Sequence, residues 1–215
     1  PGGKTIDPEN VNTSLIIGGK ELEVPIIASA MDGVVDVRMA VELTKLGALG
    51  VLNLEGVQTR YDNPEKVIKR ISNIGKDKFV PLMQEIYKQP IKKNLIKQRI
   101  LEIKNQGGIA AVSGTPLAAI NFQEAIKEAG ADIFFLQATV VSTEHVGSED
   151  QKKLDISELC ETLGMPVIVG NCVTYDVALK LMRAGVSGIL VGIGPGAACT
   201  SRGVLGVGVP QATAV

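Results

Sequence analysis

A single cysteine in a glycine-dense loop is the feature of this sequence best suited to chemistry. Residues 192–203 read GIGPGAACTSRG, with Cys199 near the middle. Glycine lets the backbone lie close to a ligand, and Pro195 stiffens the approach to the thiol. Ordering so many glycines costs much conformational entropy, so the loop has little structural reason to surround a cysteine. The pattern favours a nucleophilic Cys199 on a flexible loop over an incidental cysteine in an ordinary one.

The remaining cysteines and the one histidine do not complete a metal site or a disulfide framework. Cys160 and Cys172 are far from Cys199, and the sequence has no CxxC pair. We therefore expect free thiols, with Cys160 on the apolar face of a helix over 156–163. His145 is expected in a surface loop on the active-site side. A cysteine hydrolase would need a base near Cys199, and this base is either His145 or absent from the chain.

Composition excludes several classes of protein. The 215 residues are 45% hydrophobic with a net charge of -1, which suits one compact α/β domain and argues against a nucleic-acid partner. The densest basic run, 88–104, includes Arg99 and is expected to be the solvated face of a helix. No apolar run reaches the roughly 20 residues that span a membrane. The start of the sequence has no hydrophobic secretory segment, so a cytoplasmic location is expected.

Short apolar runs alternate with amphipathic stretches along the chain, which is typical of parallel βα units. The predicted strands are 25–30, 49–54, 109–113, 133–138, 167–170 and 188–191. The predicted helices are 37–46, 64–74, 91–105, 117–129, 156–163 and 175–184. Glycines at 47, 130, 164 and 185 suit left-handed positions after helices. The segment 75–90 is left as a short extra strand or an excursion.

The repeated unit of helix end, glycine and buried strand favours a (β/α)8 TIM barrel over a doubly wound sheet, although periodicity alone leaves both open. Polar residues follow the strands at their carboxyl ends, where barrels build active sites. These are Ser29 and Asp32 with the intervening Met31, Asn53, Glu55, residues 113–116, Gln137, Thr139, residues 171–174 and the glycine-rich Cys199 loop. About six βα units are present. We expect residues 1–215 to belong to one barrel domain whose seventh and eighth strands lie beyond Val215.

Residues 192–197 also match the dinucleotide pattern G-x-G-x-x-[GA]. Pro195 would disrupt the helix start that holds a pyrophosphate in that motif. No acidic residue follows Asp176 to bind a ribose. The match is interpreted as accidental.

Three separated motifs resemble the IMP dehydrogenase and GMP reductase family. "GIGPGAACTSR" followed by "GVGVPQATAV" resembles its catalytic loop, "PIIASAMDGV" its first-strand motif and "GNCVT" its fifth-strand motif. The similarity runs from Val24 to Val215. It implies a (β/α)8 barrel, usually a homotetramer, in which a cysteine attacks purine C2 of a nucleoside monophosphate (IMP, GMP or XMP). A nicotinamide cofactor exchanges hydride at the same carbon.

The resemblance also assigns roles to residues of this sequence. Cys199 matches the nucleophile, and Ser201 matches a hydroxyl residue that is usually threonine. The remaining implied sites are nucleotide binding by Ser29, Met31, Gly192, Gly194 and Gly196; cofactor binding by Asn171, Gln137 and Thr139; and potassium binding by the carbonyls of Gly194, Gly196 and Cys199.

Some positions depart from the family pattern. Ala197 replaces a serine that commonly contacts phosphate, Leu190 stands where many IMP dehydrogenases have a basic residue, and Gln137 lies near the place of an aspartate. The paired CBS domains usually inserted after the second strand are absent. The chain therefore resembles the CBS-lacking, IMP dehydrogenase-related bacterial branch.

Three functions remain open from the sequence. The favoured one is NADPH-dependent reduction of GMP to IMP, because GMP reductases share the lack of CBS domains and a loop hydroxyl that could assist ammonia release. NAD-dependent oxidation of IMP to XMP is the alternative. A catalytically silent purine nucleotide sensor would explain Ala197, Leu190 and Gln137.

Overall fold

Six parallel strands form the centre of the molecule. The computed structural model describes residues 7–138 and 154–215. The strands are β3 (Ile27–Ala28), β4 (Leu49–Asn53), β5 (Ala111–Gly114), β6 (Ile133–Gln137), β7 (Val167–Cys172) and β8 (Gly188–Val191). A 3-10 turn, η1 (Pro8–Asn10), and an antiparallel hairpin of β1 (Leu15–Ile17) and β2 (Lys20–Leu22) precede them.

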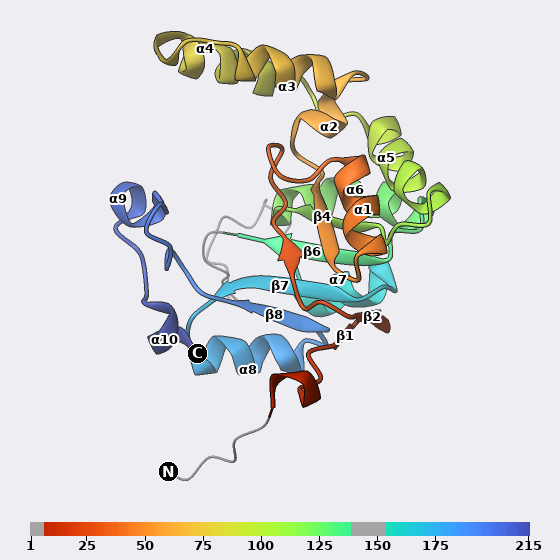
Figure 1. The fold of residues 1–215 in the computed structure, drawn as a ribbon, viewed down its shortest axis with the longest axis vertical. Helices are drawn as coiled ribbons and strands as arrows, with labels where there is room; N and C mark the ends of the chain where they lie inside the picture. The colour runs from red at the N-terminus through yellow and green to blue at the C-terminus, as the bar shows by residue number, and fades with distance from the viewer. Residues whose placement is uncertain (1–6, 139–153) are drawn as a thin grey trace.

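Helices lie outside the sheet, between successive strands and after β8 (Figure 1). They are α1 (Val37–Lys45), α2 (Val57–Arg60), α3 (Pro64–Ser72), α4 (Lys76–Tyr87), α5 (Lys93–Asn105), α6 (Pro116–Glu128), α7 (Ile156–Leu163), α8 (Tyr175–Arg183), α9 (Ser201–Leu205) and α10 (Gln211–Ala214). All six expected helices are present, with ends that differ from the predicted ones by no more than a few residues.

The order of the strands decides between the two candidate folds. The sheet runs β3-β4-β5-β6-β7-β8, with every neighbouring pair parallel. A doubly wound sheet reverses its order at a switch point, whereas consecutive right-handed crossovers keep all helices on one face and curl the sheet. The doubly wound alternative is wrong. The chain forms six βα units of a (β/α)8 barrel.

The four inner strands are buried on both faces, as their continuous apolar runs predicted. Phe134 and Phe135 illustrate the alternation. Phe134 packs in the cluster between sheet and helices, and Phe135 packs with Leu49 and Ile168 on the opposite face. Because successive side chains of a strand point to opposite sides, one strand supplies both layers.

The glycines predicted to end helices are confirmed. Gly47, Gly130, Gly164 and Gly185 all have positive φ angles, between 61° and 86°. An L-residue with a side chain rarely adopts this conformation, so glycine ends each helix and turns the chain toward the next strand.

The segment left unassigned in the sequence is a helix. α4 packs against α3 to form an arm that projects from the barrel, at the top of Figure 1. Leu82 and Ile86 of α4 are buried with Val57 of α2, and Val67, Ile68 and Ile71 of α3 pack against them. Pro81 lies inside α4 and lacks the N–H that a helix needs. Burial of Leu82 and Ile86 at helical spacing outweighs that loss.

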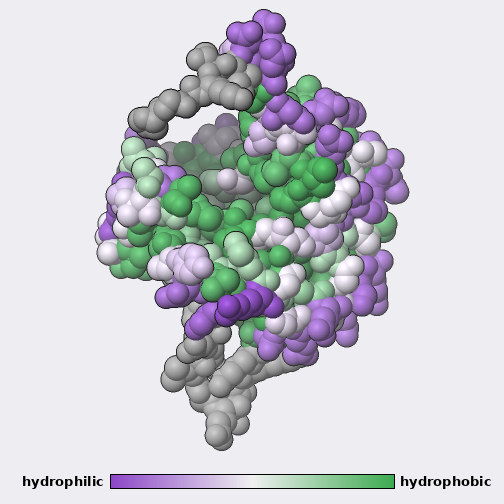
Figure 2. Space-filling model, turned by 90° about the horizontal axis from the view of Figure 1, so that it is seen from below, coloured by the Kyte–Doolittle hydropathy of each residue, from purple (hydrophilic) through white to green (hydrophobic). Residues whose placement is uncertain are grey.

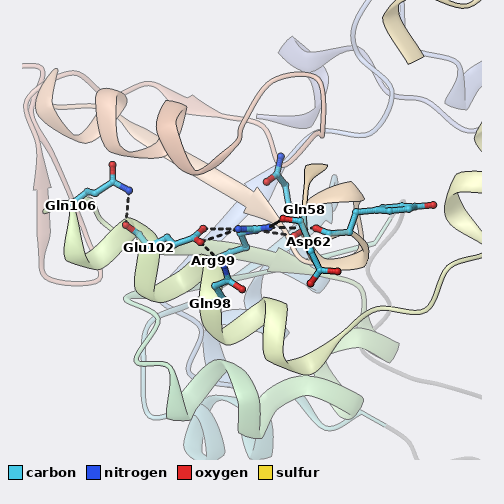
Figure 3. Close-up of polar contacts among 7 residues, drawn as sticks. Gln58, Asp62, Gln98, Arg99, Glu102 and Gln106 are labelled. Carbon is cyan, nitrogen blue, oxygen red and sulfur yellow. Dashed lines mark hydrogen bonds and ion pairs between the residues drawn. The ribbon is translucent and has the colours of Figure 1, made fainter. Parts of the chain in front are cut away.

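The expectation that the basic run on α5 is wholly solvated is wrong for Arg99, which is 6% exposed. Its guanidinium donates to the carbonyls of Gln58 and Asp62 and to the carboxylate of Glu102, as Figure 3 shows. A buried charge is tolerated only when it is paired and fully hydrogen-bonded. Arg99 therefore ties α5 to α2 and to the turn that begins the α3–α4 arm.

The two outer strands are less buried than the inner ones. Ile26, just before β3, is 60% exposed, and Val191 at the end of β8 is 42% exposed. Apolar residues also cover a broad part of the face seen from below (Figure 2). Within residues 7–138 and 154–215, no helix has the length and apolar character needed to cross a membrane.

Candidate active site

The Cys199 loop leaves the carboxyl end of β8. Between β8 and α9, Gly192 and Gly194 have φ angles of 130° and 57°, and no helix begins until Ser201. The G-x-G-x-x-[GA] match therefore does not open a helix, as the dinucleotide-binding motif would. Cys199 is half-buried, and its N–H donates to the carbonyl of Gly196 at 3.1 Å. The thiol therefore lies at a tight turn in the loop.

Ser201 sets the electrostatics of the thiol. Hydrogen bonds from the side chain and then the backbone of Ser201 lower the pKa of Cys199, with a smaller contribution from the charge of Arg202. Donors near sulfur stabilise the thiolate, which is the nucleophilic form. Cys160 differs, because burial raises the pKa of its thiol. All three cysteines are free.

The segment after α9 returns and fixes the base of the loop. Val209 N–H donates to the carbonyl of Ile193 at 2.8 Å, and the Gln211 side chain donates to the carbonyl of Val191 at 3.0 Å. Arg202 donates to the carbonyl of Gly194. A Cβ at position 208 would lie 2.4 Å from Cγ of Arg202, so glycine is required there for this contact. The loop is thus held at both ends.

A β-bulge positions Asn171 at the end of β7. Gly170 pairs with Leu190 and Cys172 with Val191, which leaves Asn171 as the extra residue. A bulge of this kind re-aims a side chain. A Cβ at Gly170 would lie 2.4 Å from Cβ of Leu190, so the strands approach this closely only with glycine. Among the described residues, no group forms a hydrogen bond with the side-chain amide of Asn171.

Two polar pairs link the carboxyl ends of β4, β5 and β6. The Ser113 hydroxyl donates to Oε1 of Gln137 at 2.9 Å. The Glu55 carboxylate accepts from the Thr115 N–H at 2.7 Å and from its hydroxyl at 3.0 Å. Neither pair was predicted. Their residues were placed at strand ends, but a side-chain contact between two segments distant along the chain leaves no local pattern in the sequence.

The first predicted nucleotide-binding residues lie in the loop after β3. Ser29 and Met31 are exposed, Met31 by 57%. The Met31 carbonyl accepts from Val34 N–H at 2.9 Å and from Val35 N–H at 3.0 Å. The Asp32 carboxylate accepts from Val57 N–H at 2.9 Å, which joins this loop to α2. An acidic residue beside Met31 was the available signal for this link.

The structure therefore brings Ser29, Met31, Gln137, Asn171 and Cys199 to the same edge of the sheet, the carboxyl ends of its strands. Thr139 and His145 lie outside the described residues.

Comparison with known proteins places the chain in a family. A family model described as the IMP dehydrogenase / GMP reductase domain matches residues 1–215. The chain is 32% identical over its whole length to an uncharacterized oxidoreductase of Mycolicibacterium smegmatis, of which it covers 59%. It is also 32% identical, over 90% of its length, to the inosine-5'-monophosphate dehydrogenase of Cryptosporidium parvum, of which it covers 49%.

Solved structures agree. An IMP dehydrogenase/GMP reductase-like protein from Corynebacterium glutamicum superposes with a TM-score of 0.87 at 29% identity, over 99% of this chain and 56% of the other. The fold and site thus define a TIM-barrel chain of an oxidoreductase family. The chain belongs to the IMP dehydrogenase / GMP reductase family. It spans between about half and three-fifths of the length of these relatives.

The connection between β4 and β5 is the place where CBS domains were expected to be absent. It consists of α2, α3, α4 and α5 and contains no further domain. The paired CBS domains expected to be absent have no place in this connection. The α3–α4 arm occupies it instead.

Proposed function

We propose that the protein is a purine nucleotide oxidoreductase in which Cys199 adds to C2 of GMP, with IMP and ammonia as products. The observation that carries the proposal is the half-buried Cys199 whose pKa is lowered by Ser201, on a glycine loop at the carboxyl ends of barrel strands. Family membership supports the substrate class. The absence of an inserted domain between β4 and β5 and the hydroxyl of Ser201 favour the reductase direction.

The chain's residues would act in three steps. The Cys199 thiolate would form a bond to C2. The 2-amino group would leave as ammonia after taking up a proton, and the Ser201 hydroxyl would relay that proton. A reduced nicotinamide, when bound, supplies the hydride that C2 needs. The C2–sulfur bond then breaks, its electrons return to Cys199 as thiolate, and IMP is released. A covalent adduct divides one difficult step into easier ones.

The residues at the sheet edge suit the proposed ligands. Ser29, Met31, Gly192, Gly194 and Gly196 would hold the nucleotide, with backbone groups of the glycine loop close to it. Asn171 and Gln137 would orient the nicotinamide. Among the described residues, the side-chain amide of Asn171 and the side-chain amide nitrogen of Gln137 have no hydrogen-bond partner. Thr139 is proposed for the same role. NADPH is the proposed cofactor.

Potassium binding remains part of the proposal. The carbonyl of Gly194 accepts from Arg202 and that of Gly196 from Cys199 N–H. A carbonyl oxygen has two lone pairs, so each keeps one for a cation. With the carbonyl of Cys199 they would hold the ion, which would order the loop. A cytoplasmic homotetramer is also proposed from the family.

A second candidate reaction is NAD-dependent oxidation of IMP to XMP. It is favoured by the curated relatives, several of which are named inosine-5'-monophosphate dehydrogenase. Cys199 would add to C2 of IMP, the C2 hydrogen would leave as hydride with NAD as its acceptor, and water would then hydrolyse the C2–sulfur bond to give XMP and the thiolate.

A chloropurine nucleotide tests the nucleophile shared by both reactions. Incubation of the full-length protein with 6-chloropurine ribonucleoside monophosphate should give a covalent adduct, located by peptide mass mapping on the segment that holds Cys199. Cys199→Ala should prevent it. Cys160→Ala, which removes a half-buried thiol on α7, should not. Lack of an adduct on a wild-type protein that binds GMP would contradict the proposal and leave the silent sensor.

A further inference from the structure

The Asp32 carboxylate is held by contacts with two other elements, beside the predicted nucleotide-binding loop. Its Oδ2 accepts from Val57 N–H at 2.9 Å and from the hydroxyl of Tyr87. A Cβ on Gly56 would lie 1.8 Å from Oδ1, so the carboxylate rests directly on the backbone at the start of α2. Oδ1 is buried, and no described residue donates to it. Two donors and a glycine therefore fix the position of Asp32.

Tyr87 is the contact of a second element with the Asp32 carboxylate. It is the last residue of α4, far along the chain from Asp32, and its ring lies 5.4 Å from the guanidinium of Arg60. Burial first, and then the hydrogen bond with Asp32, raise the pKa of the phenol well above its usual value. Tyr87 thus remains a hydrogen-bond donor throughout the neutral range.

The arm is itself fixed to the barrel on both sides of Tyr87. Arg60 donates to the carbonyls of Glu55 and Gln89, and the Tyr61 hydroxyl donates to the carbonyl of Ile86 at 3.0 Å. Arg99 holds the turn that follows α2. Tyr87 therefore reaches Asp32 from a supported position.

We propose that Tyr87 and Asp32 are positioning residues that hold the Ser29–Met31 loop in the shape that binds the purine nucleotide. Met31 directly precedes Asp32 and is exposed, so packing alone does not fix it. The α3–α4 arm thus contributes to nucleotide affinity although none of its residues is proposed to touch the nucleotide. The inference rests on the proposed function.

Two tyrosine variants test this role in the full-length protein. Tyr87→Phe removes the hydroxyl that reaches Asp32, and Tyr61→Phe removes one that reaches only the backbone of the arm. Loss of a hydrogen bond to a charged group should weaken GMP and IMP binding about tenfold in Tyr87→Phe. Hydrogen exchange should rise in the peptide covering 27–36. Calorimetry and exchange should both change less in Tyr61→Phe than in Tyr87→Phe, because Arg60 and Arg99 still hold the arm.

Two glycine variants test the same carboxylate from the side of α2, where Gly56 lies against it and Gly75 does not. Gly56→Ala should displace Asp32 and weaken nucleotide binding by tenfold or more. Gly75→Ala, at the start of α4, meets nothing within 4 Å and should leave binding unchanged. Equal nucleotide affinity in wild type, Tyr87→Phe and Gly56→Ala would overturn the inference. Failure of the wild type to bind any purine monophosphate would instead overturn the proposed function.

Discussion

At the scale of single residues, the proposed chemistry rests on the pair Cys199 and Ser201. Ser201 lowers the pKa of the thiol through hydrogen bonds, while the half-buried Cys160 has a raised pKa. A larger fraction of Cys199 than of Cys160 is therefore present as thiolate at neutral pH. Nucleophilic reactivity follows that fraction.

Substitution of Ser201 should shift the reactivity of Cys199 to higher pH. In a Cys160→Ser, Cys172→Ser background, the rate of alkylation of Cys199 by iodoacetamide rises with pH as the thiolate forms. A lowered pKa places this rise below that of an ordinary thiol. Ser201→Ala removes the largest cause of the lowering, so the midpoint should move upward. An unchanged or lower midpoint would show that Ser201 does not stabilise the thiolate.

Both members of this pair could be proposed from the sequence because they lie two positions apart in a recognisable loop, and their roles stay a prediction. The contact of Tyr87 with Asp32 spans 55 positions and joins a helix that the sequence did not predict. A partnership of this kind depends on where the arm packs, and neither residue type indicates it.

At the scale of elements, α5 is the support for everything between β4 and β5. Arg99 enters the interior from α5 and donates to three carbonyls, those of Gln58, Tyr61 and Asp62. These carbonyls lie at α2 and just after it, where no helical partner is available to them. The start of the arm and the contact of Asp32 with Val57 both depend on the segment from α2 to Asp62.

Arg99→Met should destabilise the protein far more than a matched change on the same helix. Arg99 is 7% exposed at its side chain, and its loss leaves three carbonyls without this donor and removes the ion pair with the Glu102 carboxylate, which among the described residues keeps only the hydrogen bond from Gln98. We expect a loss of about 3 kcal/mol in the free energy of unfolding. Lys97→Met breaks an ion pair whose side chains are 43% and 63% exposed. That change should cost less than about 1 kcal/mol.

Denaturant unfolding of the two variants measures this difference. Equal losses would show that Arg99 is no more than a surface charge, as the basic run on α5 first indicated.

Elements were predictable where their signals are local. Gly164 marks the end of α7 because a left-handed residue is needed directly after the helix. α4 was missed because Pro81 argues against a helix, while the compensating burial of Leu82 and Ile86 against α3 is a tertiary effect. The burial of Arg99 was missed for the same reason, since a basic side chain carries no sign of the carbonyls it will meet.

At the scale of the whole molecule, consecutive strand order gathers the site. Each crossover returns the chain to the same side, so the loops after β3, β7 and β8 open at the edge where β6 also ends. The outer strands carry exposed apolar residues such as Ile26 and Val191. We propose that further strands of the barrel pair with β3 and β8, because such edges are normally covered.

The central claim is that Cys199 performs nicotinamide-dependent chemistry at purine C2, and absorbance at the reduced-nicotinamide band tests it most directly. The full-length protein is mixed with GMP and NADPH, and in parallel with IMP and NAD. With the wild type we predict loss of absorbance in the first mixture and no gain in the second. With Cys199→Ala we predict no loss in the first mixture. A gain with IMP and NAD alone would reverse the proposed direction. Full turnover by Cys199→Ala, or no change in either mixture with a wild-type protein that binds the nucleotides, would contradict the claim.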